Sequence, residues 1–153
     1  MTLEHLYLTR QHNYVGHHGT APGTQPMEEM EELECVAGKG IRGDRYFDHK
    51  EDYKGQITFF SMEVYEDLMA KFGVSDHEPT AFRRNVMTRG VDLNTLVGKE
   101  FTWQGVRFSG SEECRPCYWM DTAFAEGAFE ALKGNGGLRA RILSDGVLRR
   151  GAV

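Results

Sequence analysis

Apolar and polar residues alternate over short runs along much of the chain, which is the pattern of half-buried β-strands. Residues 3–9 form the first such run, with Leu6 and Leu8 on one face. Further short runs predict strands at 33–37, 56–60 and 84–88. Residues 100–103 and 106–110 flank Gln104-Gly105, which predicts a hairpin with a two-residue turn.

Helical spacing occurs in only a few places. Ser61 is a suitable cap for a helix that Gly73 ends, and residues 91–97 form at most a short helical turn. Residues 118–132 have helical spacing in part, because Gly127 interrupts the pattern. The apolar face of the first helix would be Val64, Tyr65, Leu68, Met69 and Phe72.

The end of the chain predicts one more hairpin, in which residues 138–143 and 147–150 pair across Ser144-Asp145-Gly146. Several short strands, few helices and many glycine turns favour a bent sheet over parallel βαβ layers. We therefore predict a mainly β fold, a bent or closed β-barrel with a few peripheral helices. A length of 153 residues suits a single domain, spanning 1–153, that holds its core without disulfides.

Charge and cysteine content narrow the functional classes. The formal net charge is -5, which disfavours a broad basic surface for nucleic acid. An odd number of cysteines, and no apolar signal segment after Met1, favour a reducing, cytoplasmic setting. The chain also has no run of about eighteen apolar residues that could span a membrane. We expect a cytoplasmic protein that binds neither nucleic acid nor membrane.

Two of the three cysteines, Cys114 and Cys117, form a Cys-x-x-Cys pair. A thioredoxin-type redox pair begins a helix in a βαβ context, whereas predicted strand pairs surround this one. A structural zinc site needs four ligands, and Cys35 is isolated and has the character of a small core residue. Two interpretations remain: a single functional thiolate that ligates a soft metal or carries sulfur, and two ordinary buried cysteines at a strand end.

Three histidines, His12, His17 and His18, lie in a long polar segment at 11–26. Loops of this length inside a compact domain often serve function. No second ligand cluster completes a tetrahedral metal site with these histidines. We therefore expect them to be solvent-exposed loop residues.

The segment 38–45, Gly-Lys-Gly-Ile-Arg-Gly-Asp-Arg, interleaves glycines with cations. Glycine lets backbone amides approach a ligand, and lysine and arginine supply positive charge, so the segment suits an anion. Its spacing matches neither a Walker loop nor a dinucleotide fingerprint. The alternative is a surface turn in which Asp44 pairs with a neighbouring arginine.

An ordered set of motifs in this chain resembles the MOSC domain, the C-terminal domain of molybdenum cofactor sulfurases. The motifs are the segments 38–45, 82–86, 90–93, 96–98, 116–117 and 136–140. They follow one another in unbroken order over most of the chain, and an ordered set is more specific than any single motif. In size the chain is similar to the small stand-alone bacterial members.

The resemblance implies a β-rich, barrel-like fold and the molybdenum cofactor, a molybdopterin, as ligand. The family's Pro-Cys position corresponds to Cys117, so the resemblance implies that this thiol is the catalytic residue and the metal ligand, or carries a persulfide. The family's Arg-x-Asn segment corresponds to Arg83 and Asn85, which would contact the pterin or its phosphate. Arginine's forked donors suit a phosphate dianion, and a thiolate suits molybdenum.

Three more arginines, Arg42, Arg45 and Arg139, are weaker candidates for the same phosphate cradle. Their alternative role is to form internal ion pairs that hold the turns, with Asp44 and Asp92 as acceptors. Residue type alone leaves both roles open.

The resemblance implies one of two functions. The first is a molybdenum-dependent oxidoreductase that reduces N-hydroxylated small molecules, with a separate protein donating electrons. The second is a sulfur carrier that holds a persulfide on Cys117 and is loaded by a partner such as a cysteine desulfurase. No pyridoxal phosphate site is evident, so the chain would not mobilise sulfur itself. Cys114 is an addition to the family pattern that could form a transient disulfide with Cys117.

Overall fold

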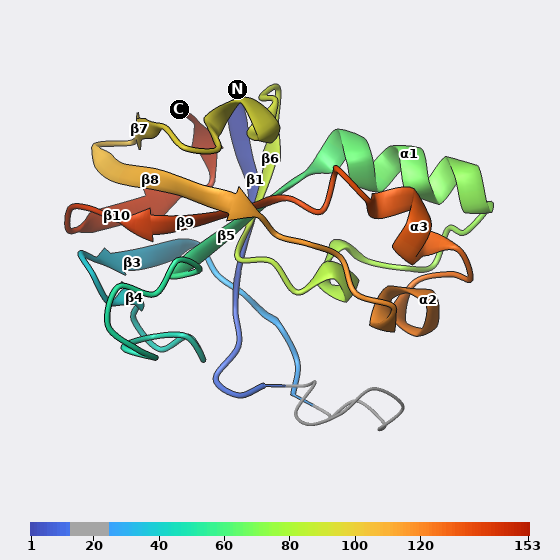
Figure 1. The fold of residues 1–153 in the computed structure, drawn as a ribbon, viewed down its shortest axis with the longest axis horizontal. Coiled ribbons are helices and arrows are strands. Elements are labelled where there is room, and N and C mark those ends of the chain that lie inside the picture. Colours follow the sequence, from blue (N-terminus) through green and yellow to red (C-terminus); the bar gives the residue numbers. More distant parts are fainter. Residues whose placement is uncertain (13–24) are drawn as a thin grey trace.

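The computed structural model describes residues 1–12 and 25–153, which form two sheets and a helical layer (Figure 1). The larger sheet has the order β11-β1-β6-β5-β9-β8-β7, with β2 paired to β1. Its strands are β1 (Thr2–Leu8), β2 (Glu28–Glu29), β5 (Ile57–Ser61), β6 (Val86–Arg89), β7 (Glu100–Trp103), β8 (Val106–Glu113), β9 (Leu138–Ile142) and β11 (Gly151–Ala152). The smaller sheet, in the order β10-β3-β4, contains β10 (Gly146–Arg149), β3 (Glu32–Val36) and β4 (Gly40–Ile41). The mainly β prediction is confirmed, but the described strands do not close into a barrel.

Helices are few and, apart from α1 (Met62–Phe72), very short. Ser61 Oγ accepts a hydrogen bond from the Val64 amide at 3.2 Å, and Gly73 ends the helix with a φ of 62°. The prediction for this helix is therefore confirmed at both ends. The other helices are η1 (Pro79–Phe82), η2 (Leu93–Leu96), α2 (Trp119–Ala123) and α3 (Ala128–Leu132). In the described part of the chain, none has the length and apolar character needed to cross a bilayer.

Two connections shape the helical layer. Strands β5 and β6 are parallel, with Phe59 in register with Val86, and α1 and η1 form the crossover between them. The region 118–132 divides at Gly127, which has a φ of 91°, so α2 and α3 are separate helices. The interruption that the sequence indicates at this glycine is therefore real.

The predicted hairpin at the end of the chain is wrong, because β9 and β10 lie in different sheets. Strand β9 pairs with β5 and β8, whereas β10 pairs with β3. The residues between them bind neighbouring segments: the Arg107 amide donates to Ser144 Oγ at 2.9 Å, and the Ala37 amide donates to Asp145 Oδ1 at 2.8 Å. These polar side chains hold the chain as it crosses from one sheet to the other.

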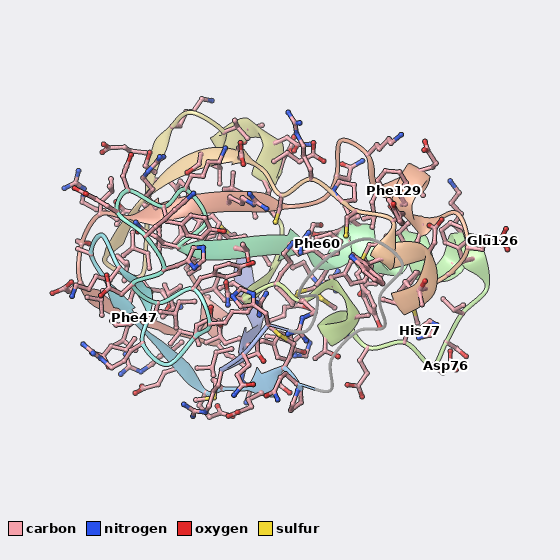
Figure 2. The ribbon with its side chains drawn as sticks, turned by 60° about the horizontal axis from the view of Figure 1, so that its bottom comes forward. Phe47, Phe60, Asp76, His77, Glu126 and Phe129 are labelled. Carbon is pink, nitrogen blue, oxygen red and sulfur yellow. The ribbon has the colours of Figure 1, made fainter. Side chains whose placement is uncertain are left out.

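The larger sheet is covered on both faces, so its residues alternate between two hydrophobic clusters. Phe59 packs into the cluster between the two sheets. Phe60 points the other way and stacks on Phe82, with ring centroids 4.5 Å apart, beneath the helices. Figure 2 shows Phe60 near the middle of the molecule, with Phe47 toward one end and Phe129 toward the helical end.

Helices α1, α2 and α3 gather at one end of the molecule, and β3 and β4 lie toward the other (Figure 1). Three segments meet at a cavity in the structure: the loop that leaves β8 at 114–117, the residues 81–84 at the end of η1, and residues 45–46 in the loop after β4. The sheet thus brings together motifs that are far apart in the sequence.

Candidate functional site

The cavity where these three segments meet has a volume of about 250 Å³. Two cysteines, Cys114 and Cys117, contribute to its wall, and the described residues that line it include no aspartate or glutamate. Five arginines line it: Arg45, Arg83, Arg84, Arg115 and Arg139. In a chain with a formal net charge of -5, this concentration of positive charge makes the cavity a suitable site for an anion.

A smaller cavity of about 60 Å³ adjoins the first and shares six of its lining residues. Tyr53 and Thr58 are among the residues that line only the smaller cavity. The shared residues are Arg45, Tyr46, Arg83, Arg84, Cys114 and Arg139. Because Thr58 belongs to β5, the positively charged wall extends inward to the sheet.

The segment that carries the thiols is fixed where β8 ends. The Cys114 amide donates to the Gly137 carbonyl at 2.7 Å, and the Gly136 amide donates to Glu113 Oε1 at 3.1 Å. Arg84 Nη2 donates to the carbonyl oxygens of Cys114 and Gly136 at 3.3 Å and 3.1 Å. Arg84 is therefore a positioning residue for the thiol loop, and sequence reasoning missed it because the Arg-x-Asn segment indicates Arg83 and Asn85 instead.

Two adjacent glycines let this loop lie close to its neighbours. A Cβ atom on Gly136 would lie 2.1 Å from the Cys114 carbonyl oxygen, and one on Gly137 would lie 2.2 Å from the Phe59 carbonyl oxygen. Gly137 also has a φ of 97°, a conformation that residues with side chains disfavour. Close backbone contact therefore accounts for the glycine pair in the motif 136–140.

The two thiols differ in exposure. Cys114 is buried, with 4 % of its surface exposed, whereas Cys117 is exposed. Arg139 lines both cavities together with Cys114, and its guanidinium pairs with Glu112 at 3.2 Å. Burial lowers the pKa of Arg139, but Cys114, Tyr53 and Glu112 raise it, and the net shift is upward. Arg139 therefore keeps its positive charge beside the buried sulfur.

The loop after β4 places Arg45 in the cavity wall. Asp44 accepts hydrogen bonds from the amides of Thr9 and Tyr46 at 3.1 Å and 3.2 Å, and the Arg45 amide donates to the Thr9 carbonyl at 2.8 Å. The Arg45 guanidinium lies 4.9 Å from the centroid of the Tyr46 ring and donates to the Arg83 carbonyl at 3.2 Å. The glycine-rich segment is thus a scaffold that Asp44 fastens to the end of β1.

Arg83 follows η1 in a left-handed conformation, with φ of 53° and ψ of 42°. This conformation costs a residue with a side chain about 1–2 kcal/mol. Arg83 Nη1 donates to the Gln25 carbonyl at 3.0 Å, and the half-buried side chain lines the cavity. Strained backbone of this kind is concentrated at functional sites.

Asn85, predicted as a pterin contact, is 3 % exposed and is not one of the lining residues. Its side-chain oxygen accepts hydrogen bonds from the amide and hydroxyl of Thr58 at 3.0 Å and 2.9 Å. Its side-chain nitrogen lies 3.3 Å from both the Tyr7 carbonyl and Asp44 Oδ1, and donates to each. Asn85, which directly precedes β6, thereby joins β1 and β5 to the loop that carries Arg45.

Arg42 also lies outside the cavity wall. It pairs with Glu34 at 2.9 Å, and its guanidinium lies over the ring of Phe47. Of the predicted site residues, the structure therefore brings together Cys117, Arg45, Arg83 and Arg139 around one cavity, and it places Asn85 and Arg42 elsewhere.

His12 lines the cavity, which differs from the solvent-exposed position expected from the sequence. It is half-buried, and its ring meets the Tyr46 ring edge-on at a centroid distance of 4.9 Å. Burial lowers the pKa of His12, and the nearby Arg45 and His49 lower it further, so the imidazole is neutral at neutral pH. The predictions for His17 and His18 fall outside the described residues.

Tyr46, Tyr53 and His49 extend an aromatic cluster from His12. The rings of Tyr46 and Tyr53 lie 5.3 Å apart, and the rings of His49 and Tyr53 lie 4.9 Å apart. Burial raises the pKa of Tyr53, with Tyr46 beside it adding to the shift, so the Tyr53 phenol stays protonated at neutral pH. No motif in the sequence marks these residues, because only the folded loop brings their rings together.

The described side chains provide few ligands for a bare metal ion. Within residues 1–12 and 25–153, no three His, Cys, Asp or Glu side chains are grouped so that they could hold one. A metal held at this cavity would therefore take few ligands from the protein, and a cofactor would have to bring the others.

Comparison with known proteins agrees with this fold. No curated protein matches the chain. The YuaD protein from Bacillus subtilis has a similar structure, with a TM-score of 0.75 and 21% sequence identity, covering 98% of this chain and 91% of that chain. YiiM from Geobacillus stearothermophilus has a TM-score of 0.69 and 14% identity, covering 98% and 71% of the two chains. YiiM from Escherichia coli has a TM-score of 0.65 and 16% identity, covering 100% and 70%.

At these identities, structural likeness shows the fold alone. The sequence itself carries the family assignment, because the sequence model of the MOSC domain matches residues 17–153. That match includes all five arginines of the cavity and both of its cysteines. The chain belongs to the MOSC domain family.

Proposed function

We propose that the chain binds the molybdenum cofactor in the arginine-lined cavity, with Cys117 as the protein ligand to molybdenum. The MOSC family is associated with this cofactor. The observation that carries the proposal is the wall of the cavity, which combines five arginines with an exposed thiol and has no carboxylate among its described residues. This combination suits a ligand that has both an anionic group and a soft metal.

The donors in the cavity fit the parts of the cofactor. The phosphate of a molybdopterin is a dianion, which arginine side chains bind through paired N–H donors. Arg84 is already occupied by three backbone carbonyls, so the proposed phosphate ligands are Arg45, Arg83, Arg115 and Arg139. A thiolate is a suitable ligand for molybdenum, and Cys117 is the exposed thiol of the wall.

The proposed reaction is reduction of an N-hydroxylated small molecule, with electrons from a separate donor protein. When bound, the cofactor would supply the two-electron redox chemistry. Cys117 would hold the metal at the open side of the cavity, where a small substrate can approach. His12 is neutral and half-buried in the same wall, so its ring can donate or accept one hydrogen bond to the substrate.

The test is the molybdenum and pterin content of protein purified from a host that makes the cofactor. We expect wild type to contain both. Cys117→Ser should lose most of the molybdenum and retain part of the pterin, because the arginines remain. Arg83→Gly should lose pterin as well, since glycine keeps the left-handed backbone while the cation is removed.

The matched control is Arg107→Gln, which removes an exposed arginine that pairs with Glu100 on the β7–β8 hairpin. It should contain as much cofactor as wild type. A wild type without molybdenum and pterin, or a Cys117→Ser variant that keeps its full molybdenum, would refute the assignment of Cys117 as metal ligand.

The exposure of Cys117, with a second thiol in the same cavity wall, favours a second candidate function. In this function Cys117 carries a persulfide that a cysteine desulfurase loads and another protein receives. Incubation with a cysteine desulfurase and cysteine should add one sulfur atom to Cys117, detected by mass spectrometry. If wild type gains no sulfur, the carrier function is excluded.

A further inference from the structure

Both cysteines of the Cys-x-x-Cys pair line one cavity, but they differ in how far they are buried. Cys117 is exposed, so a sulfur donor can reach it, whereas Cys114 is buried. Cys114 also lines the smaller inner cavity, of which Cys117 is not a lining residue. A sulfur atom received at Cys117 would therefore lie between solvent and a second thiol of the same loop.

The surroundings of Cys114 are positively charged. Arg45, Arg84 and Arg139 line the inner cavity together with Cys114. No described residue that lines this inner cavity is an aspartate or glutamate. Arginines placed around a sulfur attract anions to it, including the polysulfide and sulfide anions.

The third cysteine has none of these properties. Cys35 lies in the hydrophobic cluster between the two sheets and is 1 % exposed. Burial raises the pKa of its thiol to about 12, with Glu34 adding to the shift. Cys35 is therefore an inert thiol that can serve as an internal reference in the folded protein.

We propose that Cys114 is the resolving thiol for a persulfide on Cys117, and that the chain releases the carried sulfur as sulfide. This inference rests on the sulfur-carrier function. The Cys114 thiolate attacks Cys117 Sγ, the bond between that atom and the outer sulfur breaks, and HS⁻ leaves with the bonding electron pair. The outer sulfur is thereby reduced by two electrons to sulfide, while the two cysteines are oxidised to a disulfide. A dithiol reductant then restores both thiols.

The geometry of the loop determines which sulfur moves. The backbone of Cys114 is held on both sides, by the Gly137 carbonyl and by Arg84. Cys117 lies beyond Arg115 and Pro116 and precedes α2, with its carbonyl accepting a hydrogen bond from the Met120 amide at 3.0 Å. Cys117 is therefore the partner that swings inward, and a disulfide would require the two Cα atoms to come within about 7 Å.

The experiment compares the wild type with Cys114→Ser and Cys117→Ser. Each reduced protein is loaded with inorganic polysulfide, freed of excess reagent and kept without oxygen. A sulfide electrode follows release, and mass spectrometry after alkylation locates bound sulfur. We expect wild type to release about one sulfide per loaded chain and to end with a Cys114–Cys117 disulfide. Cys114→Ser should keep its persulfide about tenfold longer or more. Cys117→Ser should carry none.

The possible results distinguish failure of sulfide release by Cys114 from failure of the sulfur-carrier function of Cys117. If Cys114→Ser carries a persulfide on Cys117 but releases sulfide as fast as wild type, the resolving role is wrong and the carrier function stands. If Cys117 takes no sulfur in either protein, the carrier function fails and the release step fails with it. Oxidation of the wild type with diamide tests whether Cys114 and Cys117 can form a disulfide with each other. A disulfide that involves Cys35, or no disulfide at all, would overturn the proposal.

Discussion

His12 shares the cavity wall with arginines, and this position lowers the pH at which its imidazole takes up a proton. Its pKa in the folded chain lies below the ordinary value of about 6.5, so the unfolded chain binds a proton first as the pH falls. The contribution of neutral His12 to stability is therefore complete above about pH 6.5 and is lost as the pH falls from there through the lowered pKa.

Thermal unfolding measured between about pH 7.5 and pH 5 checks this prediction. The melting temperature of the wild type should fall more steeply over this window than that of His12→Gln, which has no proton to take up at this position. Parallel profiles for the two proteins would show that His12 does not contribute.

Individual site residues could be predicted from the sequence only in part. The motif 116–117 indicated Cys117, and the structure places it at the cavity. Arg42 and Arg45 look equivalent in the sequence, because both are arginines of one glycine-rich segment. Only the bonds from Asp44 to the end of β1 decide that Arg45 faces the cavity while Arg42 pairs with Glu34.

Among the structural elements, the loop that follows β8 depends on Gly136. A methyl group at this position would meet the Cys114 carbonyl oxygen at 2.1 Å and the Pro116 ring at 3.0 Å, so the thiol loop would have to move. Gly136→Ala should therefore lower the free energy of unfolding by about 1–3 kcal/mol. It should also make the Cys114 thiol more reactive toward a thiol reagent.

The control for this prediction is Gly134→Ala. Gly134 has a φ of 81°, and a Cβ atom at this position would have no heavy atom within 4 Å, so its substitution strains the backbone without touching the thiol loop. Denaturant unfolding and the rate of thiol labelling measure both variants. Equal labelling of Cys114 in Gly136→Ala and wild type would contradict the steric role given to Gly136.

Elements with local signals were predicted well, and elements that depend on long-range pairing were not. Ser61 and Gly73 mark both ends of α1 through side-chain and backbone effects that act within a few residues. The residues 144–146 carry an equally good turn signal, but their partners are Arg107 and Ala37, which lie far away in the sequence. Turn residues in the sequence do not indicate which strand the following segment will pair with.

At the scale of the whole molecule, an acidic chain concentrates arginines at one cavity. An anion that binds only the folded protein raises its stability, by about 2.7 kcal/mol when the ligand exceeds its dissociation constant a hundredfold. We expect inorganic phosphate or pyrophosphate to raise the melting temperature of the wild type. Arg45→Gln should reduce this increase strongly, because Arg45 lines the cavity.

Arg42→Gln provides the matched comparison, since Arg42 comes from the same segment but lies outside the cavity wall. Its melting temperature should respond to phosphate as that of wild type does. Thermal-shift titrations at constant ionic strength distinguish the two variants. An equal loss of response in both would indicate general charge attraction instead of a defined site.

Because the two hydrophobic clusters are separate, the helical layer can unfold locally while the sheet stays folded. Helices α2 and α3 have five residues each and pack in the cluster on one face of the sheet, while the strands have a second cluster of their own. Small units with few internal hydrogen bonds exchange their amide hydrogens through local opening that costs less than global unfolding. Because the thiol loop ends at α2, a large partner could gain access to the inner sulfur by opening this layer alone, with the sheet and its arginine scaffold left intact.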